Sequence, residues 1–234
     1  MKKGRLPSLT DYSPSRPLRI GVLISGGGSN LQALIDLCQN SSIAAEVVLV
    51  LSNVETAYGL ERAQKSGIPT LVIDHSRFEG REAFDRAMID GLDKAGVDLV
   101  CLAGFMRLLT PTFVGHYAQR LINIHPALLP SFPGLHVQQK ALDAGVRFSG
   151  ATVHFVDEGM DTGPIIAQAV VPILPGDDAN ALGARILKQE HRIYPLVVAL
   201  FARNRVRLEG GRVEIVDGGQ EPDAALLNPP MPSP

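Results

Sequence analysis

The first half of the chain alternates between short apolar runs and amphipathic segments. Four runs rich in valine, isoleucine and leucine have the composition of strands buried on both faces: LRIGVLI (18–24), EVVLVLS (46–52), TLVID (70–74) and DLVCLA (98–103). Between these runs, apolar residues recur at helical spacing over 30–38, 58–66 and 81–95. This order predicts βαβ units, and therefore an α/β fold with a mostly parallel sheet and helices on both of its faces.

The pattern changes after the run LINI (121–124). Residues 151–158 and 164–173 have the longer alternation that is typical of antiparallel strands, while 134–144 and 178–203 have helical spacing. We therefore expect the sheet to be mixed rather than purely parallel.

The sequence indicates a single domain, which spans residues 18–217. The flanking segments 1–17 and 218–234 are rich in proline and polar residues and can bury little apolar surface. We expect both segments to be disordered tails.

The composition is that of an ordinary soluble globular protein, with a formal net charge of −2 and 45% hydrophobic residues. This balance gives no support to a nucleic-acid or membrane-surface partner, and it favours a small-molecule ligand. The basic residues at the N-terminus are followed by no apolar segment, so we expect no secretory signal and a cytoplasmic location. Cys38 and Cys101 lie in apolar patterns, and we interpret them as core residues.

The loop ISGGGSNLQAL (24–34) joins the first expected strand to the first expected helix. Its glycines let the backbone expose its amides, and the helix N-terminus adds the positive end of a dipole, so the segment suits a phosphate. A tight turn without any ligand is the alternative. The dinucleotide fingerprint is absent, since Leu31 replaces its third glycine and Ser52 and Asn53 stand where an acidic residue usually holds a ribose. The loop also lacks the Gly-Lys-Ser/Thr of a P-loop, so a phosphomonoester is favoured.

Polar residues end the next expected strand, in the stretch LINIHPALLPSFPG (121–134). Strand alternation places Asn123 and His125 on one face, where both can point into one site. An amide can donate to a developing oxyanion, and a histidine can donate or accept a proton near neutral pH. Alternatively, both residues only bond the backbone of the proline-rich loop.

An acidic loop follows a later expected strand in VHFVDEGMDTGPII (153–166). Asp157, Glu158 and Asp161 are either solvated turn residues or a source of a carboxylate that pairs with His125, orients its ring and favours the imidazolium. Histidines near an acidic loop also raise the question of a metal. We expect none, because no H-x-x-x-H or cysteine pair supplies a ligand spacing.

Several ordered motifs together resemble the phosphoribosylglycinamide formyltransferase family of purine synthesis. These are ISGGGSNLQALID, LAGFMRLL, LINIHPALLPSFPGLH, TVHFVDEGMDTGPII and KQEHRIYPLVV, and the likeness runs from about Ile20 to Phe201. The resemblance implies a Rossmann-like formyltransferase fold. It also implies glycinamide ribonucleotide as the acceptor and 10-formyltetrahydrofolate as the donor, which acts as a co-substrate, with no metal and with a monomeric or homodimeric enzyme.

The resemblance assigns acceptor-binding residues at two places in the chain. Gly28, Ser29 and Asn30 match the loop that holds the ribonucleotide phosphate, in agreement with the anion site inferred from the glycine run. Glu190 matches the acidic residue that holds the ribose hydroxyls of the acceptor. Gly27 departs from the family pattern, since some members carry asparagine there.

The resemblance also assigns donor-binding and catalytic residues. The segment that lines the pterin pocket corresponds to Met106, Arg107, Leu108 and Leu109. Arg81 matches a folate-contacting arginine, and Asn123, His125 and Asp161 match the catalytic trio, with Asn123 also among the donor-binding residues. The pair at 131–132, Ser-Phe, replaces a Lys-Tyr pair found in other members.

Formyl transfer explains why these residue types are needed. The amine of the acceptor attacks the formyl carbon on N10, so the tetrahedral intermediate carries charge on oxygen and an extra proton on nitrogen. We expect Asn123 and protonated His125 to stabilise the oxyanion, and Asp161 to keep His125 charged and to help move the proton to N10.

Four other functions compete with this interpretation. A formyltetrahydrofolate deformylase would use water as the acceptor and would carry a regulatory domain, for which the N-terminal extension is too short. A methionyl-tRNA formyltransferase would add a basic RNA-binding domain at the C-terminus. A nicotinamide-dependent oxidoreductase would need the missing fingerprint, and a ligand-binding module without catalysis would make the trio incidental.

Overall fold

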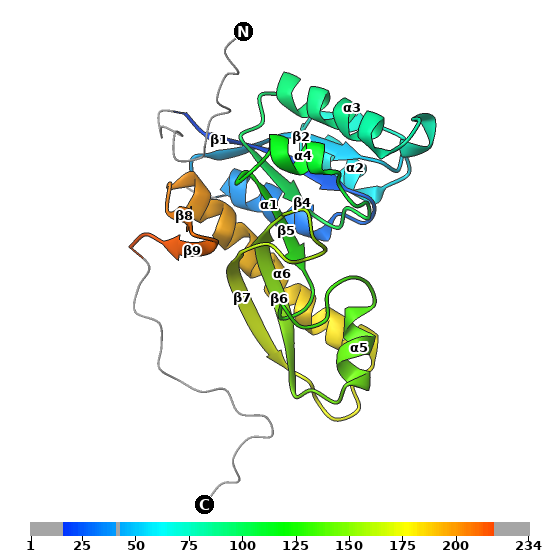
Figure 1. Cartoon of the computed structure of the whole chain (residues 1–234), viewed down its shortest axis with the longest axis vertical. Helices are drawn as coiled ribbons and strands as arrows, with labels where there is room; N and C mark the ends of the chain where they lie inside the picture. The colour runs from blue at the N-terminus through cyan, green and yellow to red at the C-terminus, as the bar shows by residue number, and fades with distance from the viewer. Residues whose placement is uncertain (1–15, 41–42, 218–234) are drawn as a thin grey trace, which may run out of the picture.

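A seven-stranded sheet forms the centre of the computed structural model, which describes residues 16–40 and 43–217 (Figure 1). The strands are β1 (Leu18–Ile24), β2 (Ala45–Ser52), β3 (Thr70–Val72), β4 (Leu99–Leu102), β5 (Leu121–His125), β6 (Phe148–Phe155) and β7 (Ile165–Pro172). They lie in the order β3-β2-β1-β4-β5-β6-β7. Neighbours from β3 to β5 are parallel, whereas β5 with β6 and β6 with β7 are antiparallel. The predicted mixed, mostly parallel sheet is confirmed.

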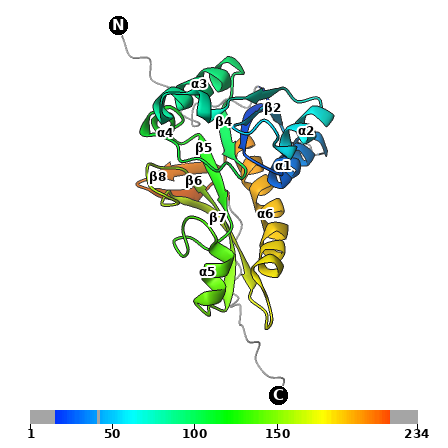
Figure 2. The same ribbon diagram turned by 90° about the vertical axis from the view of Figure 1, so that its right-hand side faces the viewer.

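Helices cover both faces of the sheet, which confirms the α/β prediction. One apolar core lies under α1 (Ser29–Asn40), α2 (Tyr58–Lys65), α5 (Val137–Asp143) and α6 (Ala179–Ala202), and the other lies under α3 (Arg81–Lys94) and α4 (Pro111–His116). Figure 2 shows α3 and α4 on the opposite side of the sheet from α1 and α6. The side chains of β1 alternate between the cores, since Val22 joins the first and Leu23 joins the second.

The structure adds short elements that the sequence pattern did not predict. These are α4, the 3-10 turn η2 (His75–Arg77), and the hairpin of β8 (Val206–Glu209) with β9 (Arg212–Ile215). Two expected strands also end earlier than predicted, because a side chain turns the backbone. Asp74 accepts from Ser76 N (2.9 Å) after β3, and Asp157 accepts from Gly159 N (3.0 Å) after β6.

The strand order reverses between β1 and β4. From β1 the chain adds β2 and β3 on one side, and it then crosses to add β4, β5 and the following strands on the other. In open α/β sheets, ligands bind at such a switch point, outside the carboxyl ends of the strands. The loops after β1 and β4 are therefore where a site is expected.

The two expected tails lie outside the described residues, except for positions 16 and 17. Arg16 donates to both carboxylate oxygens of Asp98, at 2.6 and 2.7 Å. Within the part of the chain that the structure describes, no helix combines the length and the apolar character needed to span a membrane.

Candidate active site

The glycine loop between β1 and α1 is packed against the first turn of α2. Gly28 has a left-handed backbone conformation (φ +68°), and a Cβ atom there would lie 2.7 Å from the Cα atom of Gly59. Only glycine meets both conditions without strain. The Gly28 carbonyl accepts the first hydrogen bond of α1, from Gln32 N (3.0 Å). The loop therefore presents its backbone directly at a helix N-terminus, the usual setting of an anion site.

This loop lines a hollow of about 260 Å³ at the switch point. The walls are formed by residues 25–30, after β1, and by Ala103, Gly104 and Met106, after β4. Ser25 joins the two sides, because its N–H donates to Gly104 O (3.1 Å) and its hydroxyl accepts from Met106 N (2.8 Å). The same hydroxyl donates to Asn53 Oδ1 (2.6 Å). The expected phosphate loop and the expected donor segment thus share one hollow.

The expected donor segment, residues 106–109, is an irregular loop that ends where α4 begins. Its apolar side chains are unusually exposed: Met106 is 67% and Leu108 57% accessible, whereas Arg107 and Leu109 are half-buried. Exposed apolar side chains beside free backbone groups suit a flat heterocycle with hydrogen-bonding edges.

Asp85 of α3 holds the far end of this loop. Its Oδ2 atom accepts from Thr110 N (2.7 Å), and burial raises the pKa of this carboxyl above the ordinary aspartate value. Arg81 is the first residue of α3, one helical turn before Asp85, and its side chain is exposed. Asp85 contacts the end of the donor loop, and Arg81 lies one helical turn before Asp85. Among the described residues, no direct contact joins Arg81 to the other predicted site residues.

Asn123 and His125 end β5, next to the switch point. Asn123 is paired with Leu102, the last residue of β4, so it lies beside the start of the donor loop. The two side chains are two positions apart in the strand and so share a face. His125 is buried, and Asn123 is half-buried. Of the three acidic residues in the loop after β6, Asp161 lies within 4 Å of a ring nitrogen of His125 and of His154.

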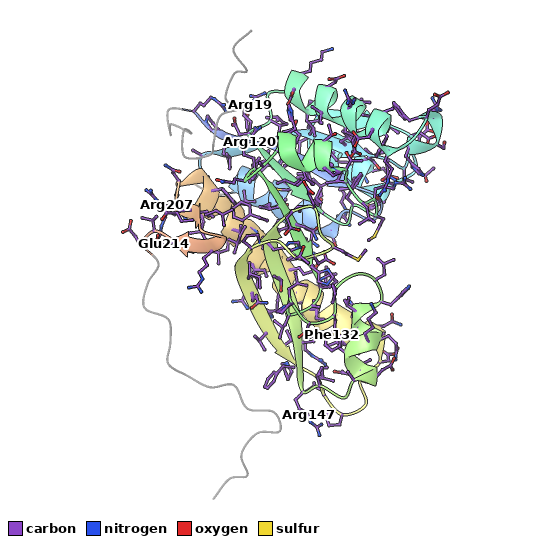
Figure 3. All side chains as sticks on the ribbon, viewed as in Figure 1. Arg19, Arg120, Phe132, Arg147, Arg207 and Glu214 are labelled. Carbon is purple, nitrogen blue, oxygen red and sulfur yellow. The ribbon has the colours of Figure 1, made fainter. Side chains whose placement is uncertain are left out.

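The ring of His125 lies between two oxygen acceptors. Its Nε2 atom donates to the carbonyl of Phe132 (3.0 Å), a residue of the loop between β5 and α5 that Figure 3 labels. Its Nδ1 atom lies 3.5 Å from Asp161 Oδ2. Carbonyl and carboxylate oxygens only accept hydrogen bonds, so a proton on each nitrogen satisfies both contacts. This geometry suits the imidazolium form.

Asp161 is fixed on a left-handed turn beside both strands. Its backbone φ is +56°, and its Oδ2 atom accepts from Gly134 N (2.8 Å). Its Oδ1 atom lies 3.7 Å from Nε2 of His154. The Asp161 carboxylate therefore lies close to two histidines. Its bond from Gly134 also connects the acidic loop after β6 to the proline-rich loop after β5.

His154 differs from His125 because its Nδ1 atom, rather than its Nε2 atom, is bonded to a backbone carbonyl. Its Nδ1 atom donates to the carbonyl of Phe155 (2.8 Å), and Asn123 Nδ2 donates to its Nε2 atom (3.3 Å). Burial lowers the pKa of His154, although the Phe155 carbonyl and Asp161 oppose that shift. A neutral ring with a free lone pair on Nε2 orients the Asn123 amide and leaves its second N–H available.

Glu190 links α6 to the glycine loop. Its Oε2 atom accepts from Asn30 Nδ2 (2.7 Å), and only 6% of the residue is exposed. Burial raises the pKa of Glu190, while the bond from Asn30 and the positive charge of His125 act in the opposite direction. The acceptor-binding residues and the histidine are therefore close enough to interact electrostatically.

Other polar residues stand apart from this cluster. Asp157 accepts from Thr162 Oγ1 (2.7 Å) within its own loop, Glu158 is exposed, and His136 precedes α5 with φ +57°. In the part of the chain that the structure describes, no group of three histidine, cysteine or acidic residues is arranged to hold a metal ion.

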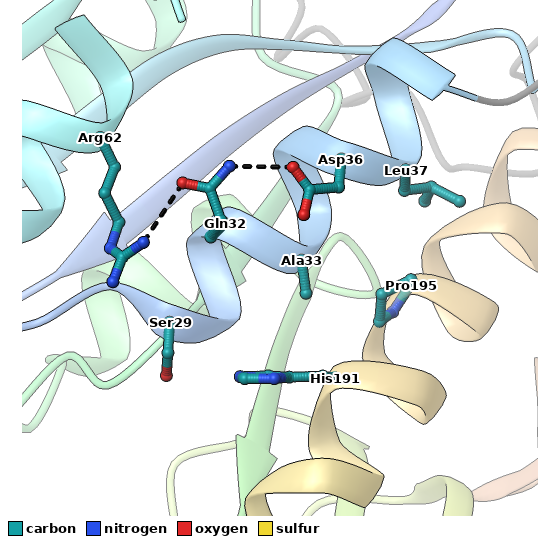
Figure 4. Close-up of a pocket in the computed structure, with 8 residues that line it drawn as sticks. All are labelled: Ser29, Gln32, Ala33, Asp36, Leu37, Arg62, His191 and Pro195. Carbon is teal, nitrogen blue, oxygen red and sulfur yellow. Dashed lines mark hydrogen bonds between the residues drawn. The ribbon is translucent and has the colours of Figure 1, made fainter. Parts of the chain in front are cut away.

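A second hollow of about 440 Å³ lies between α1 and α6 (Figure 4). Its lining includes Gln32, Asp36, Arg62, His191 and Pro195, and it shares only Ser29 with the hollow at the switch point. It is larger, and Asn123, His125 and Asp161 line neither of the two hollows. We place the chemistry beside the smaller hollow, because Asn123 is paired with Leu102, which directly precedes Ala103 and Gly104 in the wall of that hollow.

Sequence reasoning missed the role of His154 and of Ser25 with Asn53. The position of His154 opposite Asn123 depends on the antiparallel register of β5 and β6, which no local pattern in the sequence predicts. Ser25 and Asn53 each directly follow a buried strand, which was the one available signal that they could meet at the switch point.

Comparisons with known proteins agree with this geometry. The sequence model of the family described as "Formyl transferase" matches residues 18–198. The phosphoribosylglycinamide formyltransferase of Escherichia coli is 51% identical over 191 residues, which cover 82% of this chain and 90% of that protein. The crystal structure of glycinamide ribonucleotide transformylase 1 from Symbiobacterium toebii superposes with a TM-score of 0.85 at 51% identity, and the match covers 87% of this chain and 96% of that one.

A longer relative contains the same unit as one part. The "trifunctional purine biosynthetic protein adenosine-3" of Drosophila melanogaster is 57% identical over 187 residues, and the match covers 79% of this chain but only 14% of that protein. The chain thus spans about a seventh of the trifunctional relative and nearly the whole of the bacterial one. From the matched sequence and the shared fold, the chain belongs to the formyl transferase family, among members named as phosphoribosylglycinamide formyltransferases.

Proposed function

We propose that this chain transfers the formyl group of 10-formyltetrahydrofolate to the amine of glycinamide ribonucleotide, as a step of purine biosynthesis. The observation that carries the proposal is the cluster at the end of β5. Asn123 and His125 share one face beside the hollow at the switch point, and Asp161 lies 3.5 Å from the His125 ring. The relatives bearing this name support the choice of acceptor.

The glycine loop and α6 would bind the acceptor. Gly28, Ser29 and Asn30 line the hollow at the N-terminus of α1, where their amides would suit the phosphate. Glu190, held by Asn30, would accept hydrogen bonds from the ribose hydroxyls. These contacts would direct the glycinamide amine toward the end of β5.

The donor would lie along residues 106–109. Met106 and Leu108 would contact the faces of the pterin, and backbone groups of the segment would read its edge. Arg81, which is exposed at the start of α3, would contact the remainder of the folate. The donor then presents its N10-formyl group to Asn123 and His125.

Chemistry begins when the amine attacks the formyl carbon and the carbonyl electrons move to oxygen. The free N–H of Asn123 and the protonated ring of His125 stabilise this oxyanion, and one well-placed donor is worth about 3–4 kcal/mol in such a site. An oxyanion is a stronger acceptor than the neutral Phe132 carbonyl, so His125 Nε2 can exchange one for the other.

Collapse of the intermediate requires a proton on N10. The attacking nitrogen loses a proton, the C–N10 bond breaks, and tetrahydrofolate leaves with a proton on N10. Asp161 keeps the charge of His125 in place and assists this transfer, directly or through water. The two bound substrates need no metal or covalent intermediate, and their alignment supplies a further large part of the rate enhancement.

We also propose that the enzyme acts in the cytoplasm on small-molecule substrates, as a monomer or homodimer, and that residues 18–217 form its single domain. A direct test mixes the purified chain with 10-formyltetrahydrofolate and glycinamide ribonucleotide and follows the formylated product by mass spectrometry. His125→Ala and Asn123→Ala should each lower kcat by about a hundredfold or more. Release of formate at the same rate without the ribonucleotide would instead favour a deformylase.

A further inference from the structure

The three glycines of the loop each have a carbonyl group that accepts a hydrogen bond from the protein. Gly26 O accepts from Gly59 N of α2 (3.0 Å), and Gly28 O accepts from Gln32 N of α1 (3.0 Å). The carbonyl between them, Gly27 O, accepts from a side chain, the Nε atom of Arg62 (2.9 Å). Three successive peptide groups are thus oriented by α1, α2 and one guanidinium.

This orientation determines where the amides point. In a trans peptide the carbonyl and the following N–H are directed to opposite sides of the chain. The N–H groups of Gly27, Gly28 and Ser29 therefore point away from these partners, and within the described residues no acceptor bonds to any of them. Successive free N–H groups of this kind form a concave site for an anion.

Arg62 is itself held in place from several sides. Its Nη1 atom donates to Gln32 Oε1 (3.3 Å), which Figure 4 shows, and its guanidinium lies over the ring of Tyr58, 5.0 Å from the centroid. Gln32 is restrained in turn, because its Nε2 atom donates to Asp36 Oδ1 (2.9 Å). A restrained guanidinium can fix a peptide group, which a freely rotating side chain cannot.

We propose that Arg62 is a positioning residue for the acceptor phosphate. By holding the Gly27 carbonyl, it turns the Gly28 N–H toward the anion, and its positive charge lies behind the loop. This inference rests on the proposed function, since it assumes that the loop binds the phosphate of the ribonucleotide. Removing Arg62 should let the peptide between Gly27 and Gly28 rotate, because both residues are glycines.

The test compares two acceptors, glycinamide ribonucleotide and the same compound without its phosphate. Arg62→Met removes the donor and keeps most of the aliphatic stem. Arg62→Lys retains the charge but has a single donor nitrogen. Lys65→Met is the matched control, because Lys65 is a cation of the same helix that pairs with Glu61 and not with the loop.

We expect Arg62→Met to lower kcat/KM for the phosphorylated acceptor by about tenfold, mainly through KM, as for the loss of one hydrogen bond to a charged group. The value for the unphosphorylated acceptor should change by less than about twofold. Arg62→Lys should lie between Arg62→Met and the wild type, and Lys65→Met should match the wild type. The loss should persist at about 0.5 M salt, which would screen a long-range charge effect.

Two results would overturn the inference. If the wild type prefers the phosphorylated acceptor and Arg62→Met keeps the same preference, Arg62 does not position the site, although the loop still binds phosphate. If the wild type has no preference, the loop assignment fails together with the inference. Thermal unfolding shows whether Arg62→Met has lost its fold. In that case the preference of Arg62→Lys for the phosphorylated acceptor tests the inference instead.

Discussion

Replacing Gly28 by alanine tests whether the glycine loop is built for close backbone contact. The new Cβ would lie 2.7 Å from the Cα atom of Gly59, and the backbone there has φ +68°. Gly59 cannot move away easily, because its N–H is bonded to Gly26 O and its own Cα hydrogen faces Ile24, where a Cβ would lie 2.5 Å from Cδ1. Gly27→Ala is the control, since a Cβ at Gly27 meets no heavy atom within 4 Å.

The expected change in the free energy of unfolding combines a backbone cost, an opposite effect on the unfolded chain and a steric cost. A left-handed alanine costs about 1–2 kcal/mol relative to glycine. The smaller entropy of the unfolded chain returns about 0.4–1 kcal/mol. Displacing the loop from Gly59 adds a cost comparable to overpacking, about 1–3 kcal/mol. Gly28→Ala should therefore lower the free energy of unfolding by about 1–5 kcal/mol, and Gly27→Ala should change it by less than about 1 kcal/mol.

Urea unfolding and steady-state kinetics measure the two consequences. Gly28→Ala should shift the midpoint at an unchanged m-value and raise KM for the ribonucleotide, while the affinity for a folate analogue stays close to that of the wild type. Equal stability of the two variants would refute the steric reasoning. If Gly28→Ala is destabilised but its KM is unchanged, the close packing of the loop stabilises the fold and is not required for anion binding.

Three further perturbations probe the rest of the site. Asp161→Asn should lower kcat about tenfold or more with little change in either KM, whereas Asp157→Asn, in the same loop but bonded only within it, should act like the wild type in the same assay. A bound folate analogue should slow hydrogen exchange in residues 106–109, and equal exchange with and without the analogue would contradict the donor assignment. Burial raises the pKa of Glu190, so the folded protein holds a proton that the unfolded chain has released, and stability falls as pH rises from the ordinary glutamate value through the raised one. Glu190→Gln should thus be the more thermostable protein above that window and equal to the wild type below it, with weaker acceptor binding. If the difference in melting temperature between the wild type and Glu190→Gln is the same at every pH from about 4 to 8, the raised pKa of Glu190 does not contribute to the pH dependence of stability.

Much of the fold could be predicted because its strands are buried on both faces. Runs such as LRIGVLI leave few alternatives once helical spacing follows them, and β1 matches the expected 18–24. The position of Asn123 and His125 on one face also followed from alternation alone, since both lie in β5.

Short elements escaped prediction for different reasons. The six residues of α4 are fewer than two helical turns and give no usable periodicity. The hairpin of β8 and β9 did carry a signal, because Gly210 and Gly211, with φ of +56° and +78°, separate two alternating runs in the way that two-residue hairpin turns do. The glycine pair is therefore a local sequence signal for this hairpin.

Contacts between distant elements could not be predicted from any local pattern. Arg62 reaches the Gly27 carbonyl only because α2 docks against the loop, through the close approach of Gly28 and Gly59. Asp85 reaches Thr110 N only because α3 lies beside the donor loop. Such contacts depend on how helices pack, which the hydrophobic pattern of each helix leaves open.

The two buried histidines differ in the partners of their ring nitrogens, and burial, which lowers the pKa of His154, acts in addition to that difference. His125 and His154 lie on adjacent strands, and Asp161 is within 3.7 Å of a ring nitrogen of each. The Nδ1 proton of His154 is used by the carbonyl of Phe155, so its remaining nitrogen serves Asn123 as an acceptor and cannot donate without a second proton. The Nδ1 atom of His125 instead faces the carboxylate, which stabilises a proton there and leaves Nε2–H to donate. One carboxylate between two imidazoles therefore favours a single proton donor, and His125 is the residue that we propose for that function.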